Sequence, residues 1–347
     1  MKPLHRIIDQ ARSAPRHIVL CEGEDPRVLN AAARARREGI AQITLVGEAR
    51  RIIAAARACR ADLDGLDLVD PAAPAYLQPL ADALHRLRQA KGMTAPQALQ
   101  EARKPLVAAN LMVRLGQADG SVAGAVHTTA DVVRSAIQII GTHPDTSLVS
   151  SFFLMMLCQP FHSLKGGLIF SDCALVVEPD AAQLAQIAAA AADSARALLM
   201  AEPRVAMLSF STDGSARHPA VDKITAATAQ LRRLRPDIVA DGDVQLDAAI
   251  VAEIAQRKLP QSQVQGRANV LVFPNLEAGN IGYKLAERLA GAVAIGPLLQ
   301  GLARPANDLS RGCSADDVFH VIAVTVVQAQ AAAARRAAEG ATADCCP

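Results

Sequence analysis

A stretch near the amino terminus decides the fold: His17-Ile18-Val19-Leu20-Cys21, then Arg27–Glu38, then Gln42-Ile43-Thr44-Leu45-Val46. The first and third segments are short apolar runs typical of buried strands, whereas the middle segment has the apolar spacing of a helix. Continuous apolar strands that alternate with helices indicate parallel strands covered on both faces. The stretch therefore predicts an α/β fold.

The same alternation continues along the chain. Further strands are expected at Ser147–Leu154, Gly167–Phe170, Leu175–Val177, Val205–Phe210, Ile238–Ala240, Val270–Phe273 and Val293–Ile295. Further helices are expected at Pro79–Arg88, Thr94–Leu115, Ala130–Ile140, Ala181–Ala201, Ala220–Leu234, Asp247–Ala255 and Asn280–Leu289. The loop Gly141–Asp145 precedes the most apolar strand and is a candidate domain boundary, and Gln328–Pro347 offers little to bury.

Length and composition narrow the class of protein. A chain of 347 residues is long enough for about two domains. Its 36 Lys and Arg residues nearly balance 34 Asp and Glu residues, and only 3% of residues are aromatic. Neither a long-range positive field nor base-stacking platforms are available, so we expect no binding to nucleic acid and none to a membrane surface.

Cysteine usage and several absent motifs exclude other kinds of site. The seven cysteines are widely spaced without a Cys-x-x-Cys pair, which favours a reducing cytoplasm and argues against a zinc site. No apolar run reaches the roughly 18 residues of a membrane span. The sequence also lacks a P-loop, a G-x-G-x-x-G turn, a G-x-S-x-G elbow and an H-E-x-x-H pair. We therefore expect neither a metal nor a resident cofactor.

The segment from Ala118 to Arg134 has the small residues of a phosphate site. Gly120 and Gly124 allow close backbone approach, while Thr128 and Asp131 match a capping box that opens a helix. Free amides at such a helix start attract anions, and Arg134 adds a charged fork. The candidate binding residues of this segment are Thr128, Thr129, Asp131 and Arg134. The competing interpretation is a plain turn and cap with a solvated arginine.

Two further segments carry candidate substrate-binding residues. Arg88 stands just before a Lys-Gly helix stop and a Thr cap, where a solvated arginine is the simpler interpretation. Asn269–Lys284 reads as a buried strand, a Pro/Asn/Gly loop and a helix, and ligands collect at the carboxyl ends of such strands. Gly282, Tyr283 and Lys284 are the candidates there, near the expected helix start. The alternative is an ordinary strand–loop–helix connection.

The segment Pro305–Asp317 brings reactive groups together. Ser310, Arg311 and Asp317 supply a hydroxyl, a guanidinium and a carboxylate within eight residues. Asp317 also completes a capping box with Ser314, so a purely structural role competes with a chemical one. Cys313 lies near a helix start, where thiol pKa values fall, but no histidine partner for covalent catalysis can be named.

With these segments in view, the chain resembles the short form of the phosphate acetyltransferase (phosphotransacetylase) family over nearly its whole length. The matching blocks, in order, are Val19–Arg27, Leu87–Thr94, Ala118–Arg134, Met207–Ser215, Asp241–Asp247, Asn269–Lys284, Ile295–Leu302 and Asn307–Cys313. Any single block is a weak signal, whereas their joint order is specific. The Asn-Asp-Leu-Ser-Arg-Gly-Cys-Ser block resembles the acetyl-transferring branch rather than the butyryl one.

The resemblance implies reversible transfer of an acetyl group between coenzyme A and phosphate in a ternary complex, with coenzyme A and acetyl phosphate as substrates. It also implies the two-domain α/β fold of isocitrate and isopropylmalate dehydrogenases, an active site in the interdomain cleft and a homodimer. Residues 1–147 with 297–347 would form one domain and residues 148–296 the other.

The resemblance also implies roles for individual residues. Asp317 would be the general base for the coenzyme A thiol, a role typically worth about 10²–10⁴-fold in rate. Ser310 would orient the thiol or the developing oxyanion, and Arg311 would stabilise negative charge. Arg88 and Arg134 would hold phosphate groups. Two alternatives stay open: a related phosphate acyltransferase for propionyl or butyryl groups, and a catalytically silent module that senses acetyl-CoA.

Overall fold

The chain folds into two compact α/β units, each described here by itself. The computed structural model describes residues 2–343. His5–Asp145 and Leu302–Pro347 form the first, which we call the N/C unit, and Thr146–Gly301 with Met1–Leu4 form the second, which we call the central unit.

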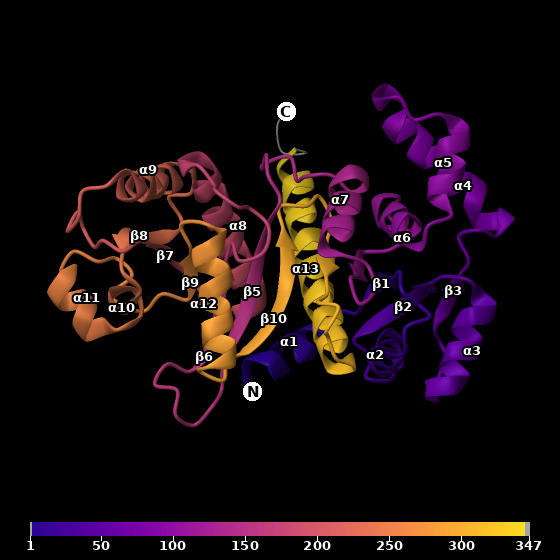
Figure 1. The fold of residues 1–347 in the computed structure, drawn as a ribbon, viewed down its shortest axis with the longest axis horizontal. Coiled ribbons are helices and arrows are strands. Elements are labelled where there is room, and N and C mark those ends of the chain that lie inside the picture. Colours follow the sequence, from indigo (N-terminus) through magenta and orange to yellow (C-terminus); the bar gives the residue numbers. More distant parts are fainter. Residues whose placement is uncertain (1, 344–347) are drawn as a thin grey trace. The chain divides into compact units, whose positions relative to one another are not determined.

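The N/C unit is built on a five-stranded sheet in the order β11-β4-β1-β2-β3, in which all pairs are parallel (Figure 1). Its strands are β1 (Arg16–Leu20), β2 (Ala41–Val46), β3 (Asp67–Val69), β4 (Gly120–Ala123) and β11 (Ala306–Asp308). Its helices are α1 (Lys2–Ser13, from His5 onward), α2 (Pro26–Arg37), α3 (Ala49–Cys59), α4 (Pro74–Arg88), η1 (Gln89–Lys91), α5 (Ala95–Ala102), α6 (Pro105–Arg114), α7 (Thr129–Ile139) and α13 (Ala315–Ala343).

Helices cover both faces of this sheet, as the apolar strands predict. Val19 of β1 belongs to a core shared with α4, α5, α6 and α7, while α2 and α13 pack against the strands β1 and β2. Local chemistry sets where α2 begins: Pro26 takes the first turn and the Asp25 carboxylate accepts the Arg27 amide at 2.8 Å. The expected β-α-β stretch is confirmed.

The central unit has a six-stranded mixed sheet in the order β10-β5-β6-β9-β7-β8 (Figure 1). Strand β5 pairs antiparallel with both β10 and β6, and the other pairs are parallel. The strands are β5 (Ser150–Leu157), β6 (Gly166–Ser171), β7 (Arg204–Leu208), β8 (Val239–Val244), β9 (Val270–Val272) and β10 (Val293–Gln300). The helices are α8 (Ala181–Leu199), α9 (Pro219–Leu234), α10 (Leu246–Ile250), α11 (Ala252–Lys258) and α12 (Leu276–Arg288).

Several expected elements differ in the structure. Leu175–Val177 is not a strand, because its first amides turn inward to the Asp172 carboxylate. The single helix expected over Thr94–Leu115 is two helices, because Pro105 holds Lys104 in an extended conformation. Gly120–Ala123 was expected to be a turn but is the buried strand β4. Its small residues suit a crowded place, since a Cβ on Gly120 would meet the Thr325 side chain at 2.7 Å.

The carboxyl-terminal segment belongs to one long helix. Helix α13 runs to Ala343 and packs against α2, β1 and β4. Beyond Gln328 only Ala329 and Ala332 are buried among the described side chains, and residues 334–338 are exposed, so the expectation of little to bury there agrees with the structure. By length and composition α13 would be able to cross a membrane, but 61% of its apolar window is buried inside the structure. A core helix passes the same test, and residues such as Phe319 and Val324, both fully buried, place α13 in the core.

Candidate active site

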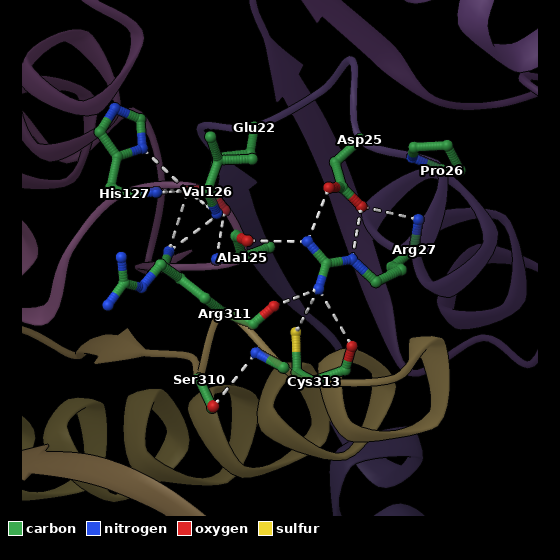
Figure 2. Close-up of polar contacts among 12 residues, drawn as sticks. Glu22, Asp25, Pro26, Arg27, Ala125, Val126, His127, Ser310, Arg311 and Cys313 are labelled. Atoms are coloured by element: carbon green, nitrogen blue, oxygen red, sulfur yellow. Dashed lines mark hydrogen bonds and ion pairs between the residues drawn. The ribbon is translucent and has the colours of Figure 1, made fainter.

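Two segments that the sequence singled out separately lie together at the carboxyl ends of adjacent strands. In the N/C unit β1, β4 and β11 are parallel neighbours, so the loops that follow them emerge at the same edge of the sheet. The loop after β1 carries Glu22 and leads to Arg27 at the start of α2, the loop after β4 carries Gly124 to His127, and the loop after β11 carries Ser310 to Cys313. Figure 2 shows the contacts among Glu22, Arg27, Ala125 to His127, Arg311 and Cys313. This edge is the candidate active site.

The Glu22 carboxylate is buried inside the loop that follows β4. The amides of Gly124, Ala125, Val126 and His127 donate to its two oxygens at 2.8–3.1 Å, and the His127 ring contacts Oε1 through Nδ1 at 2.8 Å (Figure 2). Burial alone would raise the pKa of Glu22, but these hydrogen bonds outweigh it and hold the pKa below its ordinary value. Glu22 is therefore an internal anion, and the amides of Gly124 to His127, which precede the helix start, are directed to it rather than to a ligand.

Gly124 is required by a close approach to a second carboxyl group. Its φ is +111°, and a Cβ there would collide with Oδ1 of Asp308 and with the Leu309 amide. Asp308 is fully buried, and neither of its oxygens has a hydrogen-bond partner among the described residues. Burial raises the pKa of Asp308 to about 7; the Thr129 side chain and the Leu309 amide oppose this shift, and the nearby Glu22 charge adds to it. Glu22 and Asp308 thus form a pair of buried acids of which Glu22 is ionised first.

Arg27 ties the loops together. Its guanidinium pairs with Asp25 at 2.8 Å and donates to the carbonyl oxygens of Ala125 and Arg311, both at 2.7 Å, and of Cys313 at 3.1 Å (Figure 2). One side chain at the start of α2 therefore fixes the spacing between the loop after β4 and the loop after β11. A charged group with several acceptors is well suited to that role.

The loop after β11 presents the predicted catalytic residues at the surface. Ser310, Arg311 and Asp317 are all exposed. Asp317 forms the expected capping box: its Oδ2 accepts from the amide and hydroxyl of Ser314 at 2.8 Å, and its own amide donates back at 3.1 Å. Its Oδ1 has no hydrogen bond to the described residues, so the cap leaves one carboxylate oxygen free.

Cys313 does not have the properties of a nucleophile. Its side chain is buried, and Arg27 approaches the sulfur at 3.8 Å. Burial raises the pKa of the Cys313 thiol above its ordinary value, although the Arg27 charge opposes this. The lowered pKa that a helix start gives to a thiol is therefore not found here, and this weakens the covalent alternative.

Helix α7 supplies the anion-binding candidates of the first segment. Thr128 is the N-cap and accepts the Asp131 amide at 3.2 Å, while its hydroxyl donates to Asp131 at 2.8 Å. Arg134 pairs with Asp131 at 3.0 Å, and both side chains are more than 45% exposed, at 62% and 49%. Thr129 begins the helix at the surface. Arg88 ends α4, and its guanidinium has no partner among the described residues; no contact joins it to the loops.

The candidates of the central unit lie elsewhere in their helix than expected. Helix α12 begins at Leu276 with Asn275 as N-cap, so Gly282, Tyr283 and Lys284 sit in mid-helix rather than near its start. Tyr283 stacks on Phe153 with ring centroids 4.0 Å apart, and a Cβ on Gly282 would meet the Phe273 ring at 2.9 Å. Both positions are explained by packing, and Lys284 is exposed.

Sequence reasoning assigned no role to four residues of the site: Glu22, Arg27, His127 and Asp308. The available signal was weak: Glu22 and His127 follow strands β1 and β4 by a few residues, Arg27 lies in the first turn of α2, and Asp308 is the last residue of β11. The contact that gives Glu22 its meaning joins it to His127 across 105 positions of the chain. No local pattern reveals such a pair.

One group of side chains in the described part of the chain has the proximity of metal ligands but not the chemistry. Ligand atoms of Cys21, Glu22 and His127 lie within 4.8 Å of one another. Both Glu22 oxygens already face amide N–H groups, and burial raises the pKa of Cys21 well above its ordinary value. A cation needs a thiolate and free carboxylate lone pairs, so these residues do not fit a metal.

The fold and the site together define an α/β enzyme whose reactive side chains emerge at the carboxyl ends of parallel strands. The model of one protein family, phosphate acetyl/butaryl transferase, matches residues 3–326. The chain belongs to this family.

Individual relatives agree with the family. Over 328 residues the chain is 53% identical to a phosphate acetyltransferase of Paracoccus denitrificans, covering 94% of this chain and 99% of that one. It is 48% identical to a phosphate acetyltransferase of Thermoanaerobacterium thermosaccharolyticum, covering 95% and 100%. A solved phosphotransacetylase from Streptococcus pyogenes superposes with a TM-score of 0.89 at 39% identity, covering 95% of this chain and 98% of that one.

Proposed function

We propose that this chain is a phosphate acetyltransferase, which transfers an acetyl group reversibly between coenzyme A and inorganic phosphate. Acetyl-CoA and phosphate give acetyl phosphate and coenzyme A, so coenzyme A is a substrate and no resident cofactor or metal takes part. The observation that carries the proposal is the match to phosphate acetyltransferases over nearly the full length at 53% and 48% identity. We further propose that the enzyme is cytoplasmic and works as a homodimer.

The proposed mechanism assigns a task to Ser310 and Arg311 of the loop after β11 and to Asp317 in the first turn of α13. Asp317 takes the proton of the coenzyme A thiol through its free Oδ1, because a thiol with a pKa near about 8.5 is mostly protonated at neutral pH. Ser310 orients the thiol or the oxyanion, and Arg311 stabilises the negative charge of the transition state. The thiolate then attacks the acetyl carbon and phosphate leaves. The arginines Arg134 and Arg88 bind the phosphate-bearing substrates.

The test is formation of the thioester from acetyl phosphate and coenzyme A, followed by its ultraviolet absorbance without added metal. We expect turnover in the ordinary enzymatic range, about 1–10³ per second. Propionyl phosphate and butyryl phosphate in the same assay separate the acetyl enzyme from its acyl relatives. Folded protein that forms no thioester above background would favour the alternative, a module that only senses acetyl-CoA.

The sharpest variant is Asp317→Asn, which should lower kcat by about 10²–10⁴-fold while the protein stays folded and binds coenzyme A. Its matched control is Asp316→Asn, since Asp316 is the neighbouring carboxylate, is 74% exposed and pairs with Arg34 instead. As a cap alone, Asp317 is worth at most about 1–2 kcal/mol of stability. Unchanged kcat with a lowered melting temperature would leave only the cap.

A further inference from the structure

His127 is held by a carboxylate on one side and open to solvent on the other. Its main-chain amide and its ring Nδ1 both lie 2.8 Å from Oε1 of Glu22. An ionised carboxylate only accepts hydrogen bonds, so Nδ1 carries a proton and the ring orientation is fixed. Glu22 is 3% exposed, whereas the His127 side chain is 33% exposed. The second ring nitrogen, Nε2, is therefore the part of the ring left for a ligand.

The surroundings favour the charged form of this ring. The hydrogen bond that the ring donates to Glu22 raises the pKa of His127 above its ordinary value, burial opposes the shift, and the charges of Glu22 and Asp131 add to it. The other charged groups of the neighbouring segments are Arg27 with its partner Asp25, Arg134 with its partner Asp131, Arg311, Asp317 and the buried Asp308. Because Glu22 is enclosed by amides, the charge offered to solvent at this point is positive.

The position of the ring connects it to the reactive loop. His127 directly precedes Thr128, the N-cap of α7, and stands two residues after Ala125. The carbonyl oxygens of Ala125 and Arg311 accept from the same guanidinium, each at 2.7 Å. His127 and the loop that carries Ser310 and Arg311 are thus held in one fixed cluster, which Figure 2 shows.

We propose that the His127 imidazolium, fixed by the buried Glu22, binds the phosphoryl group of the substrate by donating a hydrogen bond from Nε2 to a phosphate oxygen. The proposal rests on the proposed function, because it assigns His127 to the phosphate side of acetyl transfer. Glu22 is then a positioning residue: it touches no substrate but keeps the ring oriented and charged. The contact is available whether phosphate leaves or attacks.

The probe is sulfate, which has the geometry of phosphate but keeps the same charge across the neutral pH range. Its affinity is measured by calorimetry and as inhibition competitive with acetyl phosphate, at a series of pH values. In the wild-type protein sulfate affinity should fall as pH rises through the raised pKa of His127. His127→Gln should bind sulfate about 10–100-fold more weakly at acid pH, and its affinity should lack this pH step.

The matched control is His143→Gln. His143 also lies beside a carboxylate, Asp145 at 3.6 Å, and its side chain is 27% exposed, but it belongs to no part of the site. This variant should keep the wild-type pH step. Equal pH dependence of sulfate binding in folded His127→Gln and in the wild type would overturn the proposal.

A second measurement, nuclear magnetic resonance of the wild-type protein, does not depend on the activity of any variant. The ring resonances of His127, assigned as those missing from the spectrum of His127→Gln, should titrate at a higher pH when sulfate is added. A midpoint unmoved by sulfate would refute the contact even if acetyl transfer is normal. A shifted midpoint in a protein that forms no acetyl-CoA would instead remove the proposed function and leave the anion contact standing.

Discussion

Both units bury a carboxylate just beyond the end of a strand and surround it with main-chain amides. Glu22 stands two residues after β1, and Asp172 directly follows β6. Asp172 accepts from the amides of Ala174 and Leu175 at 2.8 and 2.9 Å and from the amide and hydroxyl of Ser151. All of these donors are neutral, whereas Glu22 has the same kind of amide shell plus the ring of His127.

The difference lies in where each carboxylate leads. Asp172 is 3% exposed and closed off by α12, since a Cβ on Gly279 would collide with the Asp172 carbonyl oxygen. Its hydrogen bonds end inside the unit and hold a loop in place. The His127 ring also donates to Glu22, and this ring reaches solvent near the loop of Ser310 to Cys313. The same local architecture thus fixes a loop in the central unit (an anchor). In the N/C unit it also orients and charges an exposed histidine ring (an electrostatic support).

The largest effects should come from removing each carboxylate in turn. Glu22→Gln and Asp172→Asn each lose several charged hydrogen bonds, so we expect either variant to lose about 3–5 kcal/mol in the free energy of unfolding. Urea unfolding measures this loss. The stability lost in Glu22→Gln should become smaller in acid. The lowered pKa of Glu22 stabilises the folded wild type at pH values above the ordinary glutamate pKa, and this contribution is lost as the pH falls through the pKa of Glu22 in the folded protein.

The two variants should differ in function. Only Glu22→Gln should abolish the pH step in sulfate binding, since Asp172 supports no exposed ring. Folded Asp172→Asn should keep both the step and the activity per folded molecule. If neither variant altered the pH dependence of sulfate binding, the contrast between anchor and support would be wrong.

Asp308 is the opposite case, because it is a buried carboxyl whose burial outweighs the nearby Thr129 side chain and Leu309 amide. Its pKa rises from the ordinary 3.8 to about 7. Between those values the unfolded chain releases a proton that the folded protein keeps, so the free energy of unfolding falls as pH rises through this window. Each pKa unit is worth about 1.36 kcal/mol, which gives a loss of about 4 kcal/mol.

Asp308→Asn removes this titration. The stability of the variant relative to the wild type should therefore improve by up to about 4 kcal/mol between about pH 4 and about pH 8, as read from urea unfolding. Asp316→Asn, a change at an exposed carboxylate, is the control. A stability difference for Asp308→Asn that stays constant across this range would show that Asp308 is not held protonated.

How much of the fold could be predicted from the sequence depends on how far apart in the chain the contacting residues lie. Strand β1 and helix α2 follow from local apolar spacing and a Pro-containing cap, and both were predicted. Strands β4 and β11 were missed, because their Gly, Ser, Asn and Asp residues become strand only between neighbours from distant parts of the chain. Their side chains are buried by those neighbours rather than by their own composition.

The site divides in the same way. Ser310, Arg311 and Asp317 stand within eight residues, so sequence alone could single them out. Glu22 and His127 gain their meaning from a contact across 105 positions, and Asp308 from its burial in a closed interior. Neither the contact nor the burial can be seen in a local stretch of sequence. The electrostatics of the site therefore needed the structure.

The smallest effects should come from the buried thiols, which also occur in both units. Cys313 contacts Arg27 at 3.8 Å, and Cys173 follows Asp172; burial raises the pKa of both thiols above the ordinary value. Cys313→Ala and its control Cys173→Ala should each keep acetyl transfer within about tenfold of the wild type, because a protonated buried thiol with no histidine base is a poor nucleophile.

Mass spectrometry after mixing with acetyl phosphate should find no acetyl group on Cys313. An acetyl thioester on that residue, or ping-pong kinetics lost in Cys313→Ala alone, would replace direct attack in a ternary complex with a covalent route.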